Sequence, residues 1–206
     1  MNLCVYGASS NEINREYIEA VEKLGEKMAK RGHTLIFGAG AGGCMGAAAR
    51  GVDRAHGDIV GIVPSFFNVD GVLYDHCTKL VETDTMRERK KLLEDYSDAF
   101  IIAPGGVGTL DEFFEILTLK QLARHKKAIV LFNINGYYDE LGVFMRKLVD
   151  ENFAQEETLD LMEMFTDIDK MLDYIENYEQ PDIVVSDMKH MASEPEKSQP
   201  TDVNEF

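Results

Sequence analysis

Hydrophobic residues in this chain follow two alternating patterns. Short apolar runs are typical of buried strands, and longer stretches with apolar residues three and four positions apart are typical of helices. The short runs predict strands at residues 3–6, 34–37, 59–63, 80–81, 100–103 and 128–132. The helical pattern predicts helices over residues 11–30, 45–55, 86–96, 110–125, 137–152 and 169–178. Gly32 is expected to end the first helix, and residues 65–78 read as a loop.

Strands that alternate with helices pair in parallel through right-handed crossovers. The sequence therefore predicts an α/β fold, a doubly wound and mostly parallel sheet flanked by helices, of Rossmann-like type. Ligands of such sheets bind beyond the carboxyl ends of the strands. Three glycine-containing segments, residues 7–10, 38–46 and 105–108, follow predicted strands, so they are expected to converge on one rim.

The chain of 206 residues is long enough for one domain with a sizeable core. We expect a single nucleotide-binding domain over residues 1–180. Periodicity is lost after Gln180, and residues 181–206 are rich in acidic residues, Ser and Pro. This composition predicts a disordered acidic tail.

Net charge is −16 and unevenly distributed, since residues 151–206 hold 16 acidic residues and only three Lys or Arg. An acidic surface argues against a nucleic acid as the main partner. It does not exclude a small phosphorylated ligand, because local positive groups decide that. No stretch approaches the roughly 18 to 20 apolar residues of a membrane helix, so no membrane partner is expected.

Three cysteines, Cys4, Cys44 and Cys77, have no metal-type spacing. Their odd number predicts reduced thiols that are buried or half-buried, and no metal site. The N-terminal segment leads directly into a predicted strand without a basic region, which is unlike a signal peptide. A cytoplasmic protein is therefore expected.

Residues 104–112, PGGVGTLDE, carry the most informative pattern of the chain. Gly105, Gly106 and Gly108 follow a buried strand and precede a helix, so backbone N–H groups at the positive end of that helix form a natural anion site. Glu112 follows one turn into the helix. A structural alternative stands beside this reading, because Thr109 and Glu112 also have the spacing of a capping box.

A second glycine-rich segment, residues 38–43, formally matches the G-x-G-x-x-G pattern after a strand. The acidic residue that a dinucleotide site requires at the end of the next strand is missing, and no Walker A sequence occurs. The remaining interpretation is a mononucleotide or sugar-phosphate site built from several loops.

Four basic residues lie near the start of the predicted helix over residues 86–96: Arg87, Arg89, Lys90 and Lys91. A solvated helix face is the usual meaning of such a run, and Thr85 and Glu88 have capping-box spacing. Basic groups in a first turn are unfavourable to the helix dipole. A negative group is therefore expected near Arg89, either Glu112, a ligand phosphate, or both.

Together these two segments resemble the signatures of the Lonely Guy family of phosphoribohydrolases, long mislabelled as lysine decarboxylases. The P-G-G-x-G-T-x-x-E motif is found at residues 104–112, and the M-x-x-R-K motif at Met86, Arg89 and Lys90. Residues 6–10, 38–46 and 133–139 also look familial, and the resemblance covers roughly residues 2–178.

This resemblance implies cleavage of the N-glycosidic bond of a nucleoside 5′-monophosphate, such as AMP or a cytokinin riboside 5′-monophosphate, into a free base and ribose 5-phosphate. It assigns the catalytic roles to Arg89 and Glu112. The implied substrate-binding residues are Met86, Lys90, Gly105, Gly106, Gly108, Thr109 and Thr118. Homodimers with the site close to the subunit contact are also implied. No cofactor is expected.

Bond cleavage builds positive charge on the ribose and negative charge on the leaving base. Glu112 could stabilise the oxocarbenium-like centre by bonding the ribose hydroxyls, or activate water as a general base. Arg89 could steady the base or orient Glu112. A catalytically silent nucleotide-binding or carrier protein is the alternative function, and a pyridoxal-dependent decarboxylase lacks a distinctive lysine context. Base preference is expected to depend on residues 64–78.

Overall fold

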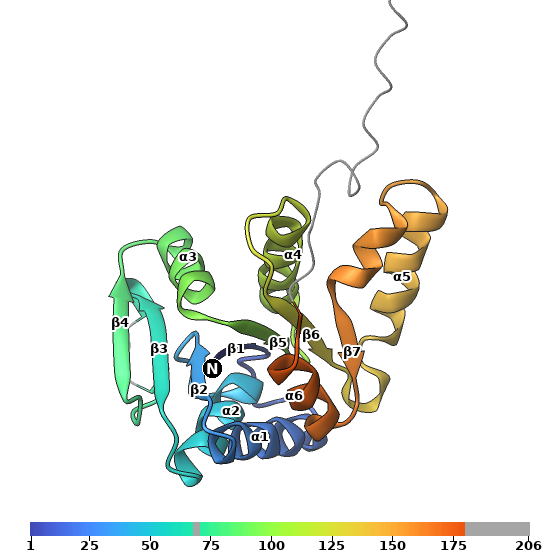
Figure 1. The fold of residues 1–206 in the computed structure, drawn as a ribbon. Coiled ribbons are helices and arrows are strands. Elements are labelled where there is room, and N and C mark those ends of the chain that lie inside the picture. Colours follow the sequence, from blue (N-terminus) through green and yellow to red (C-terminus); the bar gives the residue numbers. More distant parts are fainter. Residues whose placement is uncertain (68–70, 180–206) are drawn as a thin grey trace, which may run out of the picture.

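A computed structural model of the chain describes residues 1–67 and 71–179. Seven parallel strands form one sheet in the order β4-β3-β2-β1-β5-β6-β7 (Figure 1). The strands are β1 (Asn2–Tyr6), β2 (Thr34–Phe37), β3 (Ile59–Pro64), β4 (Lys79–Thr83), β5 (Ala99–Ile102), β6 (Ala128–Phe132) and β7 (Glu163–Phe165). The predicted doubly wound α/β fold is confirmed.

Helices cover both faces of the sheet (Figure 1). One face carries α1 (Arg15–Lys30), α2 (Gly43–Arg54) and α6 (Ile168–Glu176), and the other carries α3 (Met86–Tyr96), α4 (Val107–Gln121) and α5 (Asp139–Asp150). Three short 3-10 turns complete the described elements: η1 (Ser65–Phe67), η2 (Ile134–Gly136) and η3 (Glu156–Leu161).

Alternation along each central strand divides the core into two layers. In β1, Leu3 and Val5 pack with α1 and α2, whereas Cys4 and Tyr6 pack with α3 and α4. Successive side chains of a strand point to opposite faces, so a strand buried on both faces reads as a continuous apolar run. This is why the central strands could be located from their runs alone.

Element boundaries differ from the predictions at several places. The first helix begins at Arg15 rather than at residue 11, because the Asn14 side chain accepts a hydrogen bond from the Glu16 N–H and caps it. Gly32 follows the helix with φ +77°, as its predicted role as a terminator requires. Strand β7 was not predicted, since it has three residues and none of them is fully buried.

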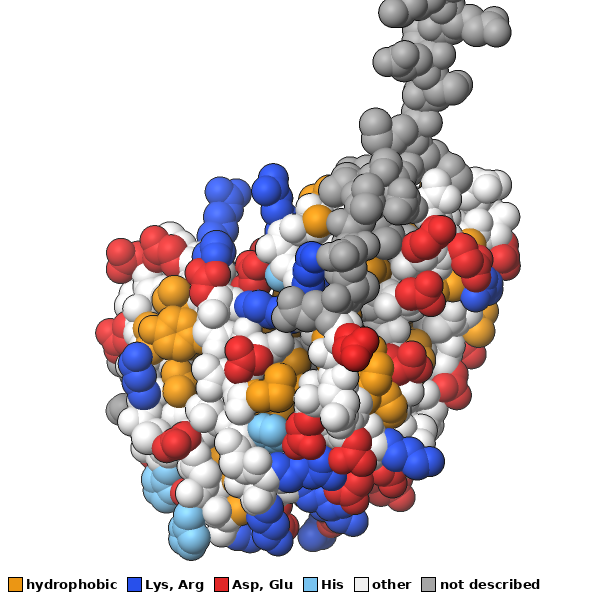
Figure 2. All heavy atoms as spheres, viewed as in Figure 1, with side chains coloured by type: hydrophobic (Ala, Val, Ile, Leu, Met, Phe, Trp, Pro, Cys, Tyr) orange, Lys and Arg blue, Asp and Glu red, His pale blue; other side chains and the backbone are white. Residues whose placement is uncertain are grey.

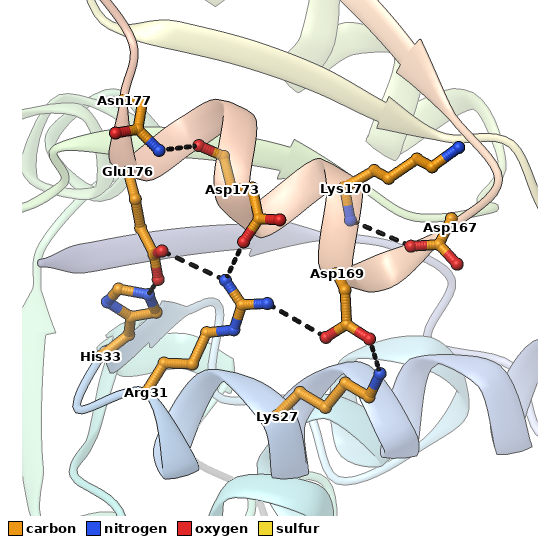
Figure 3. Close-up of polar contacts among 9 residues, drawn as sticks. All are labelled: Lys27, Arg31, His33, Asp167, Asp169, Lys170, Asp173, Glu176 and Asn177. Atoms are coloured by element: carbon orange, nitrogen blue, oxygen red, sulfur yellow. Dashed lines mark hydrogen bonds and ion pairs between the residues drawn. The ribbon is translucent and has the colours of Figure 1, made fainter.

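An ion-pair network fastens α6 to the end of α1 (Figure 3). Arg31 donates to Asp173 at 2.6 Å, to Asp169 at 3.0 Å and to Glu176 at 3.1 Å. His33 contacts Glu176 at 2.8 Å through Nε2. Three carboxylates on one face of α6 therefore share one guanidinium from the neighbouring helix.

Acidic side chains are visible over α5 and α6 and also, on the left of the view, beside β4 and α3 (Figure 2). The predicted tail, residues 181–206, lies outside the described residues, so its disorder stays a prediction. None of the described helices combines the length and the apolar character that a membrane span requires.

Candidate active site

The sheet changes winding direction between β1 and β5, its two adjacent central strands. The chain proceeds from β1 outward to β4 on one side and from β5 outward to β7 on the other. The loops that leave the two strands are joined by a hydrogen bond of 3.0 Å from the Ala8 N–H to the Pro104 carbonyl. This switch point is where open α/β sheets bind their ligands.

A cavity of about 650 Å³ lies at this point. All three glycine-containing segments contribute to its lining, which confirms that they converge. Residues that line it include Ala8, Asn11, Gly38, Gly40, Met45, Val72, Leu73, Met86, Arg89, Lys90, Gly106, Gly108, Thr109, Asp111 and Glu112.

Arg89 and Glu112 form an ion pair in the wall of the cavity. The distance from Arg89 Nη1 to Glu112 Oε1 is 2.8 Å, and the two side chains are only 9% and 12% exposed. Arg89 Nε also donates to the Ile62 carbonyl at 3.3 Å, which ties the guanidinium to the end of β3. Glu112 is therefore a negative partner of Arg89, as predicted.

Gly38 leaves room for this arginine. A Cβ atom on Gly38 would lie 1.9 Å from Arg89 Nη2, far inside van der Waals contact. The glycine at the end of β2 thus permits the guanidinium to reach Glu112.

Burial raises the pKa of Glu112, while the neighbouring Arg89 and, more weakly, Lys90 lower it. The carboxylate is thus removed from water and depends on the guanidinium for its charge. A carboxyl group poised in this way can take part in proton transfer or stabilise a cation.

Helix α4 begins earlier than predicted and is capped differently. Its N-cap is Gly106, no side chain caps it, and no acidic residue lies in its first turn. Thr109 is therefore inside the helix, and the capping-box alternative for Thr109 and Glu112 is wrong. The Thr85–Glu88 capping box at the start of α3 is present, with both reciprocal bonds formed.

Two tyrosines from the segment after β6 hold the turn that precedes α4. Tyr137 donates to the Gly105 carbonyl and Tyr138 to the Ala103 carbonyl, each at 2.7 Å. The Gly105 Cα lies so close to Thr109 that an added Cβ would come within 2.1 Å of its hydroxyl oxygen. These contacts hold the turn in place. The N–H groups at the start of α4, which have no partner within the helix, therefore face the cavity.

Most residues predicted for the site lie together. Of the predicted set, Met86, Arg89, Lys90, Gly106, Gly108, Thr109 and Glu112 line the cavity, and Gly105 is buried in the supporting turn. Thr118 lies instead in an adjoining groove between α3 and α4, together with Phe114 and Leu119.

The four basic residues near the start of α3 differ in their environment. Arg89 is buried at the site, and Lys90 bridges Asp111 and Glu115 at 2.6 and 2.7 Å. Arg87 is exposed, and Lys91 is an exposed residue that pairs with Asp95 on its own helix. The solvated-face alternative holds for these two residues only.

A model of the protein family described as "Possible lysine decarboxylase" matches residues 45–175. A cytokinin riboside 5′-monophosphate phosphoribohydrolase from Mycobacterium tuberculosis is 40% identical over 153 residues, which cover 74% of this chain and 81% of the relative. A probable enzyme of the same name from Arabidopsis thaliana is 34% identical over 152 residues, 74% of this chain and 76% of the relative.

The chain belongs to the Lonely Guy family. The family inferred from the paired motifs is thereby confirmed. The structure of a molybdenum cofactor carrier protein from Chlamydomonas reinhardtii also superimposes on this Lonely Guy chain, with a TM-score of 0.65, 20% identity and coverage of 85% and 94% of the two chains. At that identity the likeness concerns the fold alone.

Several cavity residues of this Lonely Guy protein were not found from its sequence. Asn11 accepts a hydrogen bond of 2.8 Å from the Gly43 N–H and joins the first loop to the start of α2. Val72 and Leu73 lie within residues 64–78, the segment on which base preference is expected to depend, but no helical or strand periodicity marks them individually. In the described residues, no group of three or more His, Cys, Asp or Glu side chains could hold a metal ion.

Proposed function

We propose that this protein hydrolyses the N-glycosidic bond of a nucleoside 5′-monophosphate and releases a free base and ribose 5-phosphate. The observation that carries the proposal is the buried Arg89–Glu112 pair, which faces a cavity bounded by the uncapped start of α4. The names of the relatives support it, since they are phosphoribohydrolases of cytokinin riboside 5′-monophosphates.

In the proposed complex the 5′-phosphate accepts hydrogen bonds from the N–H groups of residues 106–109. The helix dipole favours an anion there, and fixing the phosphate positions the sugar. The ribose then lies beside Glu112, and the base extends toward Met45, Val72 and Leu73.

Water supplies the oxygen that bonds to C1′ of the ribose in this reaction. The electrons of the broken bond go to the nitrogen of the base, which is protonated on leaving. Glu112 either accepts the proton of the attacking water or stabilises the positive charge on the ribose. Arg89 keeps Glu112 ionised and oriented, and is close enough to contact the substrate itself.

A panel of nucleoside 5′-monophosphates tests the proposal. AMP and N6-substituted adenine nucleotides should yield base and ribose 5-phosphate in equal amounts, and Glu112→Gln should reduce the rate at least about 100-fold. Adenosine should react far more slowly than AMP, because the remote phosphate contributes to turnover as well as to binding. Nucleotide binding without base release would favour the alternative carrier function.

We propose further that the protein acts as a homodimer in the cytoplasm. The groove between α3 and α4 adjoins the cavity and shares Met86, Lys90 and Asp111 with it. Its half-buried Phe114 and Leu119 suit a second copy of the chain. This arrangement would bring Thr118 of one protomer near the site of its partner.

The three free thiols are consistent with a reducing compartment such as the cytoplasm.

A further inference from the structure

One wall of the cavity is built from residues 71–73, which the glycine loop after β2 holds by backbone pairing. The Ala41 N–H donates to the Val72 carbonyl at 3.0 Å, and the Tyr74 N–H donates to the Ala39 carbonyl at 2.8 Å. Gly40 and Leu73 form an antiparallel bridge between these two bonds. The two segments therefore behave as one structural unit, with Val72 and Leu73 turned to the cavity.

Helix α2 holds this unit through two side chains that lie one turn apart. Arg50 Nη1 donates to the Ala41 carbonyl at 3.2 Å. The Tyr74 hydroxyl donates to Asp53 Oδ2 at 2.9 Å, and His76 Nδ1 lies 2.8 Å from the same oxygen. One face of α2 thus fixes both the glycine loop and the wall that pairs with it.

The anchored backbone includes a strained residue. Ala39 has φ +62°, a left-handed conformation that costs a residue with a Cβ about 1 kcal/mol or more. Its carbonyl receives the Tyr74 N–H, so releasing Tyr74 would let this turn relax.

The charge of Asp53 and the protonation of Tyr74 favour the hydrogen bond between them. Hydrogen bonds from His76 and then Tyr74 lower the pKa of Asp53, so it is a carboxylate. Burial and then Asp53 raise the pKa of Tyr74 to about 12, so its phenol keeps the proton that it donates. The Tyr74 ring also packs edge-on against Phe37, with centroids 6.5 Å apart.

We propose that Asp53 and Tyr74 are positioning residues, which hold Val72 and Leu73 against the base of the substrate and thereby set which bases the site accepts. The inference rests on the proposed function. It follows from the lining of the cavity, in which the proposed function gives the polar part, with Arg89, Glu112 and the start of α4, to the ribose and phosphate. The apolar side, with Met45, Val72 and Leu73, remains for the planar base.

Tyr74→Phe removes the hydroxyl but keeps the ring that packs on Phe37. For AMP we expect KM to rise about 5- to 30-fold with kcat within about 2-fold, since a hydrogen bond to a charged group fixes the wall. Ribose 5-phosphate lacks the base, so its inhibition constant should stay within about 2-fold. A uniform loss of AMP and ribose 5-phosphate affinity would overturn the proposal, because it would indicate general damage.

Tyr174→Phe is the matched control, because Tyr174 is a half-buried tyrosine of α6 away from the cavity. It should leave both constants unchanged. Asp53→Asn should reproduce the effect of Tyr74→Phe, and the double variant should be no worse than either single variant. Additive losses would show that the two residues do not act through one contact.

Hydrogen exchange tests the anchor without turnover. The Ala41 and Tyr74 amides should exchange at least about 5-fold faster in Tyr74→Phe than in the wild type, with β1 unaffected. Unchanged exchange rates would refute the anchor, whatever the activity.

If the wild-type protein releases no base, the proposed function fails. Calorimetric titration of the wild type and Tyr74→Phe with AMP and ribose 5-phosphate then decides whether Val72 and Leu73 still contact the base. A selective loss for AMP would support the positioning role, and an equal loss for both ligands would refute it.

Discussion

The Arg89 side chain makes a set of contacts that no other cationic side chain reproduces. Its Nη1 reaches Glu112 while Nε reaches the Ile62 carbonyl, so two groups of a planar fork point in different directions. Lysine has a single ammonium and cannot occupy both positions. The geometry of the pair, rather than its charge alone, should therefore govern activity.

Arg89→Lys is expected to lose most of the activity, at least about 50-fold in kcat/KM. Lys90→Ala should be milder, because Lys90 bonds only Asp111 and Glu115 at the edge of the cavity. Steady-state rates of base release from AMP measure both effects, with circular dichroism as the check of folding. Near-normal turnover of Arg89→Lys would show that charge suffices.

Gly38→Ala should lower activity although it changes neither Arg89 nor Glu112. The new Cβ would lie 1.9 Å from Arg89 Nη2 and displace the guanidinium, whose Nη1 bonds Glu112. We expect a loss of about 10- to 100-fold in kcat, with a small change in stability because the arginine can turn toward the cavity. Gly142→Ala is the control, since its Cβ would meet only the flexible end of Met164 at 3.3 Å. Equal activity of the two variants would contradict the steric argument.

The protein should lose activity as the pH falls, and the loss should begin at a higher pH than that at which an ordinary glutamate titrates. Because burial raises the pKa of Glu112, protonation removes its charge as the pH falls through that raised value. Lys90 lowers the same pKa, so Lys90→Ala should move the acid limb of kcat to higher pH. Comparing the two pH profiles cancels the titration of the substrate phosphate. If the acid limb of kcat in Lys90→Ala stays at the wild-type pH or moves to lower pH, Glu112 is excluded as the titrating group.

At the scale of elements, the end of α1 and the face of α6 depend on one another through charge. Arg31 is 25% exposed and serves three carboxylates of α6, which would repel each other without it (Figure 3). Networks of this kind contribute more than single surface pairs, whose median value is small.

Arg31→Met should lower the free energy of unfolding by about 1 kcal/mol, measured by urea denaturation at low salt. The loss should shrink in 1 M NaCl, because salt screens the repulsion among the three carboxylates. Arg15→Met is the matched control: Arg15 is 87% exposed and pairs only with Glu19, one turn along the same helix. A loss for Arg31→Met no larger than for Arg15→Met would mean that the network contributes nothing beyond an ordinary surface pair.

At the scale of the whole molecule, the proposed dimer should form through the groove between α3 and α4. Thr118→Arg introduces a long charged side chain beside Phe114 and Leu119 and should halve the mass measured by light scattering. Activity should fall with the dimer if Thr118 completes the partner's site. Val143→Arg is the control, because Val143 is exposed on the far helix α5. A wild-type mass of one chain would refute the dimer, and an unchanged mass of Thr118→Arg would place the contact elsewhere.

Sequence alone determined the layers of this molecule and the location of its chemistry. Buried strands of a parallel sheet are apolar on both faces, so β1, β2, β5 and β6 could be located from their runs. The order of strand, glycine turn and helix around residues 104–112 placed an anion site at the rim, because helix starts and strand ends meet there. The paired motifs also led to the family, which the comparisons confirmed.

Tertiary structure decided which of these groups meet. The pairing of Arg89 with Glu112 depends on how α3 packs beside α4, and the sequence left a capping box for Glu112 open. No helical or strand periodicity marks Val72 and Leu73. Their position depends on backbone pairing with a loop some 30 residues earlier and on the hydrogen bond from Tyr74 to Asp53 of α2. Local patterns encode the elements because neighbours in the chain share them. Contacts between distant segments arise only from packing, and in this protein they shape the cavity.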